Sequence, residues 1–213
     1  MPSKPARDAI LDSAEMLFGE RGFNGASLRQ ITEKAGVNLA AVNYYFRSKE
    51  DLYRQVVIRR VRPINEQRLI LLTQAEQLAG DQAVPLRAIL DTFIRPFLRT
   101  AGDPASGGSP FVRLLGRELT DPLPFLRGEL EREFAPLMTR YTHALSQALP
   151  GVSPAELDWR RRFAFGAMLF LAARAPEPQR ATTGAGPAEE RDGGIRRLVD
   201  FCAAGFAAAR PSA

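Results

Sequence analysis

The fold of this chain is decided by the stretch SLRQITEKAGVNLAAVNYYF, residues 27–46. It contains two short segments, residues 28–35 and 39–45, whose apolar residues have helical spacing. Gly36 lies between them, and a glycine allows the positive φ that a tight turn between two helices requires. The stretch therefore predicts two short helices joined by a tight turn, the arrangement of a helix-turn-helix.

Polar residues mark where the helices of this region begin. Ser27 precedes the first short helix, and Gln30 three residues later completes the pattern of a capping box. Asn38 precedes the second short helix, and Ser48 precedes a longer segment, and both residue types are favoured N-caps. These caps predict the boundaries from local side-chain chemistry.

The rest of the sequence is also helical in pattern, and we expect an all-α chain of about nine helices. Convincing alternation of polar and apolar β-forming residues is absent from the sequence. Glycine- and proline-rich composition predicts loops at residues 101–109 and 176–194. The expected helices cover residues 6–20, 28–35, 39–45, 49–79, 86–99, 111–119, 124–149, 154–174 and 195–209.

Charge and composition narrow the possible functions. The 213 residues carry a net charge of +5, and residues 1–62 hold 11 Lys and Arg against 7 Asp and Glu. A basic N-terminal region suits a polyanionic partner such as DNA. Cys202 and His143 are single residues of their type, so we expect no disulfide, no Cys/His metal site and a reducing compartment.

The sequence also argues against a membrane protein and against an enzyme. It has no apolar run of the ~20 residues that a membrane-spanning helix needs, and its polar N-terminus lacks the apolar core of a signal peptide. We therefore expect a cytoplasmic protein with no membrane partner. Catalytic triads, paired carboxylates and glycine-rich phosphate loops are missing, so we expect no enzyme activity and no cofactor. An enzyme that uses His143 stays open as the less favoured alternative.

Two kinds of side chain in the helix-turn-helix suit DNA. Small and amide side chains on the second short helix can approach base edges in the major groove: Asn38, Leu39, Ala40 and Asn43. Hydroxyl and basic side chains around them can hold phosphates: Ser27, Arg29, Tyr44 and Lys49. The alternative is a three-helix packing unit in which the tyrosines are core aromatics. We expect Tyr44 to face outward and Tyr45 to be partly buried.

This region closely resembles the TetR family of transcriptional regulators. The resemblance covers about residues 6–55 and is carried by RGF at 21–23, GASLRQI at 25–31, AGV at 35–37 and YYFxSKExL at 44–52. It implies a homodimer that binds double-stranded DNA at a palindromic operator. It also implies a C-terminal helical domain that holds a small-molecule inducer and dimerises through its last two helices. One departure is Asn43, where the family often has a tyrosine, and this asparagine is expected to contact a base.

The resemblance divides the chain into two expected domains. Residues 1–47 form a three-helix, helix-turn-helix DNA-binding domain, and residues 48–213 form a helical bundle for ligand binding and dimerisation. The expected function is a repressor that an inducer releases from its operator. A DNA-binding protein without any ligand is the second possibility.

The C-terminal half is partly similar to the PsrA-like, fatty-acid-responsive subgroup of that family. The similarity rests on residues 111–119 and on the Asp121-Pro122 pair that follows. It implies a small apolar or amphipathic inducer, with fatty acids and acyl-CoA esters as candidate classes. Arg113 and Arg117 share a helical face, where they either anchor a carboxylate or face solvent, and we favour solvent. Bulky side chains that could line a cavity, or simply form core, are Phe93, Phe97, Leu114, Phe134, Met138 and Tyr141.

The last two expected helices are the candidates for a dimer interface. Their apolar residues could form a four-helix bundle with a second copy across a two-fold axis. Packing within one chain is the alternative. The candidate interface residues are Phe163, Ala167, Phe170, Leu198, Phe201 and Phe206.

Overall fold

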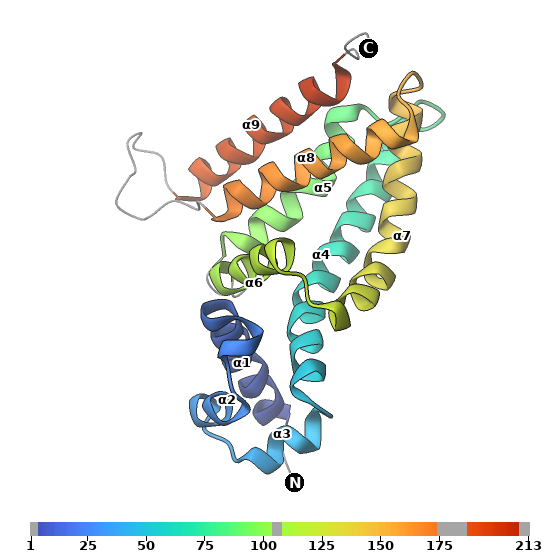
Figure 1. The fold of residues 1–213 in the computed structure, drawn as a ribbon. Helices are drawn as coiled ribbons and strands as arrows, with labels where there is room; N and C mark the ends of the chain where they lie inside the picture. The colour runs from blue at the N-terminus through green and yellow to red at the C-terminus, as the bar shows by residue number, and fades with distance from the viewer. Residues whose placement is uncertain (1–3, 104–107, 174–186, 209–213) are drawn as a thin grey trace. The chain divides into compact units, whose positions relative to one another are not determined.

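The computed structural model describes residues 4–103, 108–173 and 187–208, and these ranges form nine α-helices (Figure 1). The all-α prediction is therefore confirmed for the described chain. The helices are α1 (Lys4–Gly25), α2 (Leu28–Ala35), α3 (Leu39–Tyr45), α4 (Lys49–Ala79), α5 (Leu86–Ala101), α6 (Gly108–Thr120), α7 (Pro124–Ala148), α8 (Pro154–Ala173) and α9 (Pro187–Ala207).

The helices are organised in two compact units. The first unit comprises Met1–Pro63 and Asp103–Glu133, and the second comprises Ile64–Gly102 and Phe134–Ala213. Helices α4 and α7 each contribute residues to both units. These packing units differ from the expected division at residue 47, because α6 and the first residues of α7 belong to the same unit as the N-terminal helices.

The predicted caps and turn of the helix-turn-helix are confirmed. The Ser27 hydroxyl accepts from the Gln30 backbone N–H at 3.2 Å, and the Gln30 carboxamide accepts from the Ser27 N–H at 3.0 Å. The Asn38 carboxamide accepts from the Ala41 N–H at 2.9 Å. Gly36 has a φ of 65°, which lies in the left-handed region that glycine tolerates. Short-range hydrogen bonds therefore set both ends of α2 and the start of α3.

Helix α1 is interrupted near its end and is held there by α6. Gly22 has a φ of 72° and a ψ of 176°, which are not helical values. The Arg117 guanidinium of α6 donates to the carbonyl oxygens of Gly19 at 3.4 Å and Glu20 at 2.9 Å. These carbonyls are at the end of a helical segment, where intrahelical donors are missing. Arg117 thus caps α1, and both Arg113 and Arg117 are exposed as expected.

A buried carboxylate joins α1 to α4 within the first unit. Glu15 is 2% exposed, and it accepts hydrogen bonds from Arg59 at 2.5 Å and from Arg60 at 2.8 Å. Arg59 also pairs with the exposed Asp12 at 2.8 Å. Burying a carboxylate is unfavourable unless it is paired and hydrogen-bonded, so these arginines compensate the charge that Glu15 brings into the interior.

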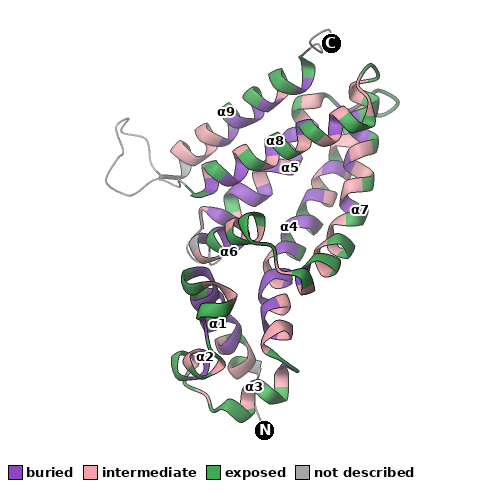
Figure 2. Cartoon of the chain, viewed as in Figure 1, coloured by how far each residue is buried: buried purple, intermediate pink, exposed green. Residues whose placement is uncertain are grey.

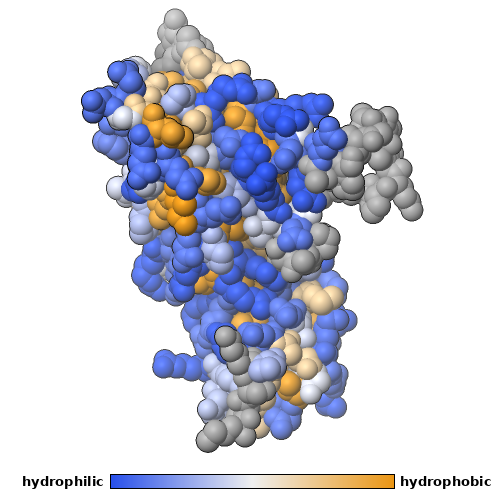
Figure 3. Space-filling model, turned by 180° about the vertical axis from the view of Figure 1, so that it is seen from behind, coloured by the Kyte–Doolittle hydropathy of each residue, from blue (hydrophilic) through white to orange (hydrophobic). Residues whose placement is uncertain are grey.

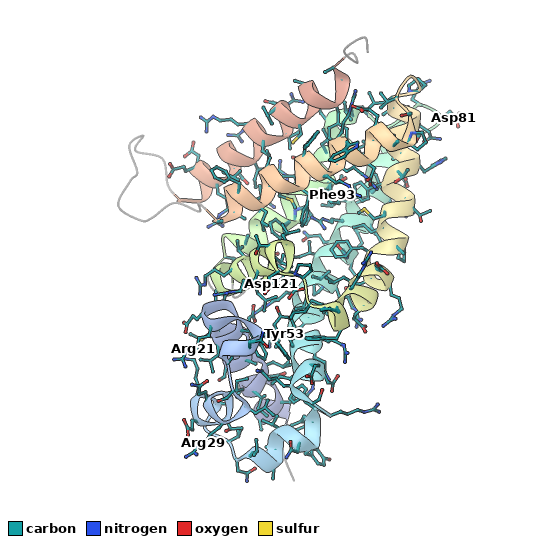
Figure 4. The ribbon with its side chains drawn as sticks, viewed as in Figure 1. Arg21, Arg29, Tyr53, Asp81, Phe93 and Asp121 are labelled. Carbon is teal, nitrogen blue, oxygen red and sulfur yellow. The ribbon has the colours of Figure 1, made fainter. Side chains whose placement is uncertain are left out.

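Aromatic residues complete the core between α1, α4 and the start of α7. The Tyr53 ring, labelled in Figure 4, lies 4.9 Å from that of Phe18 and 5.4 Å from that of Phe23, centroid to centroid. The Phe125 ring lies 4.9 Å from that of Phe23. The Tyr53 hydroxyl donates to the Glu118 carboxylate at 2.5 Å. Burial and this carboxylate both raise the pKa of Tyr53, so it remains a neutral donor.

In the second unit, α5, α8 and α9 pack against one another. Buried and exposed residues follow one another along α8 and α9, as expected of helices with one covered face (Figure 2). Asp192 of α9 lies 3.5 Å from Arg95 and 3.6 Å from Arg99 of α5. The apolar side chains of α9 that are buried here are Ile195, Leu198, Val199, Cys202 and Phe206.

The start of α9 corrects the sequence prediction. Residues 176–194 were expected to be a loop, but the part from Pro187 to Gly194 is helical, and residues 176–186 lie outside the described residues. Proline suits the first helical position, and Glu189 and Glu190 in the first turn complement the helix dipole. Loop-like composition was therefore outweighed by favourable residues at the helix start and by packing against α5 and α8.

The remaining boundaries differ from the prediction by a few residues. Helix α6 begins at Gly108, three residues before the expected start at Phe111. Among the helices of residues 4–103, 108–173 and 187–208, none combines the length and apolar character needed to cross a lipid bilayer. Seen from behind, the surface is largely hydrophilic, with separate apolar patches (Figure 3).

Candidate DNA-binding surface

Helix α3 presents a face of small and polar side chains to solvent. Val42 is 1% exposed and Phe46 is 2% exposed, so these two residues fix the helix on the core of the first unit. The opposite face is exposed over its whole length (Figure 2). The exposed residues include all those that the sequence predicted for base contacts, namely Asn38 at the N-cap and Leu39, Ala40 and Asn43 within the helix.

The two asparagines differ in the hydrogen-bonding groups that remain available for DNA. The Asn38 Oδ1 atom accepts from the Ala41 N–H as the helix cap, which leaves the Asn38 amide hydrogens as donors. Asn43 is exposed on the following turn, where its carboxamide can donate and accept at once. A carboxamide of this kind can form the bidentate pair with adenine N6 and N7 in the major groove.

Tyr44 and Tyr45 have the orientations expected from the sequence. Tyr44 is 67% exposed, whereas Tyr45 is only partly exposed. The two rings are 5.1 Å apart in an edge-to-face arrangement, which holds Tyr44 against its neighbour. The Tyr44 hydroxyl is therefore presented on a supported ring beside α3, where a phosphate contact is geometrically possible.

Ser27 and Arg29 lie on α2 and its cap. The Ser27 hydroxyl accepts a hydrogen bond as the cap, so its own hydrogen can still be donated to an anion. Arg29 pairs with Glu33 at 3.1 Å, with both side chains well exposed (Figure 4). Exposed pairs of this kind contribute at most ~1 kcal/mol, so exchange of Glu33 for a phosphate is inexpensive.

Lys49 begins α4 and lies against an aromatic ring. Its ammonium nitrogen is 4.5 Å from the centroid of Phe23. Partial burial lowers the pKa of Lys49, while the neighbouring Glu50 opposes that shift. The ring supports the side chain of Lys49, so the ammonium group has a defined position at the first turn of α4.

Arg47 is an exposed cation that the sequence analysis did not select. It lies between the end of α3 and the start of α4, and its backbone N–H donates to the Asp51 carboxylate at 3.0 Å. The signal was available, because a basic residue directly follows the last residue of the helix-turn-helix. Arg47 adds positive charge at the edge of the surface formed by α2 and α3.

The six residues predicted to line a ligand cavity do not form one set. Leu114 is fully buried in the first unit, whereas the other five belong to the second unit. Phe97 and Tyr141 are buried there, and the Phe93 ring lies 5.2 Å from Tyr141. Phe134 and Met138 are partly exposed. Leu114 therefore belongs to the core of the first unit, which also contains the helix-turn-helix.

The candidate dimer residues also fall into two groups. Phe163, Phe170 and Phe201 are 68%, 63% and 71% exposed. Leu198 and Phe206 are 8% and 3% exposed, so their side chains belong to the core of their own chain. Ala167 is intermediate. Helical periodicity finds apolar residues but does not distinguish which of two packed faces each one covers.

Trp159 is an exposed aromatic that belongs with this group. It is 56% exposed, and its ring is 5.8 Å from that of Phe163 in a stacked arrangement. Its position four residues before Phe163 places both on one face of α8. The spacing of Trp159 and Phe163 was visible in the sequence, but Trp159 was not included among the candidate interface residues.

A capped helix-turn-helix with an exposed second helix, followed by further helices, is the architecture of a DNA-binding transcriptional regulator. Two family profiles match the chain. "Bacterial regulatory proteins, tetR family" matches residues 10–56, and "Tetracyclin repressor-like, C-terminal domain" matches residues 91–205. The second profile covers more than half of the sequence. The chain therefore belongs to the TetR family of transcriptional regulators.

Solved structures share this fold over nearly the whole chain. A TetR family transcription regulator from Marinobacter aquaeolei VT8 has a TM-score of 0.67 and 18% identity, covering 93% of this chain and 94% of its own. A TetR-like regulator from Rhodococcus sp. RHA1 has a TM-score of 0.60 and 19% identity, covering 98% and 100%. The regulator FadR from Bacillus subtilis, in complex with stearoyl-CoA, has a TM-score of 0.59 and 16% identity, covering 96% and 99%. At these identities the likeness concerns the fold alone.

Curated relatives match only the DNA-binding region. The probable HTH-type transcriptional regulator YttP of Bacillus subtilis is 45% identical over 51 residues, which are 24% of this chain and 25% of that protein. The HTH-type transcriptional dual regulator CecR of Shigella flexneri is 50% identical over 48 residues, 22% of this chain and 21% of that protein. The matches thus span a quarter or less of these relatives. The family to which this chain belongs consists of DNA-binding transcriptional regulators rather than enzymes.

Proposed function

We propose that this protein is a homodimeric repressor that binds a palindromic operator and is released from it by an amphipathic small molecule. The observation that carries the proposal is the exposed surface of α3 and its N-cap, which presents two carboxamides (Asn38 and Asn43), the small Ala40 and the apolar Leu39 to solvent. Small residues let a helix backbone approach the floor of the major groove, and carboxamides read base edges there.

A homodimer follows from the length of DNA that one such helix can read. One short recognition helix contacts only a few base pairs, whereas two copies related by a two-fold axis read two half-sites about 34–36 Å apart. We infer that the dimer forms through the aromatic face of α8 and α9, defined by Trp159, Phe163 and Phe201. Exposed aromatics gathered on two neighbouring helices are typical of association surfaces rather than of a free monomer surface.

The inducer is expected to bind in the second unit. Phe93, Phe97, Phe134, Met138 and Tyr141 supply apolar and aromatic surface from α5 and α7 of that unit. The structural likeness to FadR, which was solved with stearoyl-CoA, supports a ligand with a long apolar part. Fatty acids and acyl-CoA esters are therefore the candidate classes.

Release requires that the inducer bind the two states of the dimer unequally. A ligand that prefers the DNA-free state shifts the population toward that state, and operator binding weakens by the same coupling factor. Because the recognition helices must match successive major grooves, a small change in their separation is sufficient to weaken the complex.

The test is a competition between operator and inducer. An operator is first selected from random double-stranded DNA with the full-length protein, and its complex is followed by fluorescence anisotropy. We expect palmitate or palmitoyl-CoA to release the operator, whereas neither should release an unrelated regulator from its own site. Retention of the operator at saturating concentrations of both would favour a DNA-binding protein that is independent of these ligands.

A further inference from the structure

One arginine lies in the interior of the second unit. Arg68 of α4 is 2% exposed and is the largest fully buried side chain among the described residues. Along α4 it falls at the spacing of the buried residues Ile64, Asn65 and Leu72, so it points into the core. Charged residues are rarely buried completely unless they are paired, so this position needs a physical reason.

The groups that contact the Arg68 guanidinium are all neutral. Nε donates to the Phe93 carbonyl oxygen at 2.8 Å, and Nη1 donates to the Asn65 carboxamide oxygen at 3.1 Å. Nη2 faces the Met168 sulfur at 3.8 Å, and the Phe93 ring centroid lies 4.0 Å from the guanidinium carbon. In the described part of the chain, no Asp or Glu forms an ion pair with Arg68.

Two other buried or partly buried arginines each form an ion pair with a carboxylate. Arg60 pairs with Glu15 in the first unit, and Arg160, which is 7% exposed, pairs with Glu156 in the second. Arg68 alone among these three brings a positive charge into the interior without a negative one. Burial lowers its pKa to about 10, and at neutral pH it is still protonated.

The guanidinium also has unused hydrogen-bonding capacity. An arginine side chain has five N–H donors, and three of them are used here, one only toward a weak sulfur acceptor. The two remaining donors are on Nη1 and Nη2. These atoms form the edge of the guanidinium that binds a carboxylate with two parallel hydrogen bonds.

The surroundings suit an acid whose remaining part is apolar. The Tyr141 hydroxyl lies 3.1 Å from the Arg68 carbonyl oxygen and 2.9 Å from the Thr92 hydroxyl. Burial raises the pKa of Tyr141 to about 12, so this hydroxyl is neutral at physiological pH. The Phe93 ring, labelled in Figure 4, packs against Tyr141 beside the guanidinium. The unused hydrogen-bond donors are thus those of the Arg68 guanidinium, and aromatic rings lie beside it.

We propose that Arg68 is the anchor for the carboxylate of an aliphatic acid, which binds the Nη1–Nη2 edge and displaces the Met168 thioether. Methionine is flexible and its sulfur is a weak acceptor, so its displacement costs little compared with the charge-assisted hydrogen bonds gained. The proposal rests on the proposed function in one respect, since it places the head group of the inducer at this site.

The test compares acids with alcohols of equal chain length. Octanoate, dodecanoate and hexadecanoate, and the three corresponding 1-alkanols, are titrated into the full-length protein without DNA by isothermal titration calorimetry. Charge-assisted hydrogen bonds predict that at least one acid binds about tenfold or more tightly than its alcohol. In Arg68→Gln this difference should disappear through a loss of acid affinity, and Arg68→Lys should restore part of it.

A matched control is Arg140→Gln. Arg140 of α7 belongs to the same unit but already pairs with Glu76, so its replacement should leave the preference for the acid unchanged. Folding of each variant is checked by thermal unfolding. Arg68→Met gives a second measurement, because replacing an uncompensated buried charge by an apolar side chain should preserve or raise the melting temperature without ligand.

The proposal is overturned if none of the acids binds, if acid and alcohol bind equally, or if Arg68→Gln retains the preference. A marked fall in melting temperature in Arg68→Met would also contradict it, since Arg68 would then be a structural link between α4 and α5. Failure of the proposed function has a different signature. Acid binding that depends on Arg68 but does not release the operator would preserve the anchor and exclude these acids as inducers.

Discussion

The most buried charged side chain of each unit, Glu15 in the first and Arg68 in the second, has different surroundings. In the first unit Glu15 is enclosed by Arg59 and Arg60, so α1 and α4 are joined by a compensated ionic cluster. In the second unit Arg68 is enclosed by a carbonyl, a carboxamide and a sulfur, with no carboxylate of the described residues beside it. The charge of Glu15 is compensated within the fold, whereas that of Arg68 is not, and we have proposed that a ligand carboxylate compensates it. The comparison therefore distinguishes an ion-paired site that joins α1 to α4 from a buried cation that has no carboxylate partner among the described residues.

The exposed side chains of the two units also differ in polarity. The first unit exposes polar and small side chains on α3, as suits the solvated and charged surface of DNA. The second exposes Trp159, Phe163 and Phe201 on α8 and α9, as suits a second protein surface. We expect the largest effect on operator affinity from introducing negative charges on the aromatic face of α8 and α9.

Phe163→Glu combined with Phe201→Glu should convert the proposed dimer into a monomer. A monomer contacts only one half-site and loses the affinity that two linked DNA-binding modules gain by binding together. Operator affinity should therefore fall by about 100-fold or more. Sedimentation velocity and fluorescence anisotropy measure the two effects. The control is Leu78→Glu, at an 89% exposed leucine of α4, which should leave both unchanged. A dimeric double variant would exclude this face as the interface.

Glu15→Gln should destabilise the first unit. The substitution leaves two arginines facing a neutral group in a partly buried site, and breaking a buried ion pair in this way costs about 3 kcal/mol of unfolding free energy. Asp12→Asn is the matched control, because Asp12 also pairs with Arg59 but is exposed, so its loss should cost under ~1 kcal/mol. Urea denaturation distinguishes them. Equal effects would show that burial of Glu15 is unimportant.

Arg29→Ala should weaken operator binding without changing sequence preference. A lost phosphate contact reduces the dependence of log affinity on log salt concentration by about one per contact in each half-site. Measuring affinity over a series of salt concentrations tests this. Arg127→Ala provides a comparison, since Arg127 forms a similar exposed i, i+4 pair on α7, away from the helix-turn-helix in sequence. An unchanged slope for Arg29→Ala would remove it from the DNA-binding surface.

The smallest expected effect concerns helix caps. Ser27→Ala removes the cap of α2 and should cost about 1 kcal/mol of stability, together with some operator affinity. Ser153→Ala removes the corresponding cap hydrogen bond of α8, at 3.3 Å, in the second unit. It should cost a similar amount of stability and leave operator affinity at the wild-type level. Equal losses of affinity in the two variants would mean that both act only through global stability.

The sequence was most informative where structure depends on neighbouring residues. The bounds of α2 and α3 follow from Ser27, Gly36 and Asn38, because caps and turns act over three or four residues. The start of α9 was missed because Pro187, Glu189 and Glu190 were interpreted as loop composition. Their position at the first turn of a helix was the better signal.

Features that depend on distant packing could be predicted only in part. Leu198 and Phe201 have the same apolar character, yet only packing against α5 and α8 decides that one is buried and the other exposed. Arg117 is exposed as expected, but its role as a cap of α1 was not predicted, because it requires a contact between residues almost 100 positions apart. Arg68 lies at a core position of α4. A charged residue at a position where the helical pattern expects an apolar one was the sequence signal that could have indicated its burial.

The central claim is that α3 reads DNA bases through Asn43 in both halves of a dimer. It is tested most directly by selecting binding sites from random double-stranded DNA with the full-length wild-type protein and with Asn43→Ala. We predict an inverted repeat with half-sites about one helical turn apart for the wild type, and relaxed preference at one symmetric position per half-site for the variant. A selected sequence without two-fold symmetry, or the same preferences in both proteins, would contradict the claim.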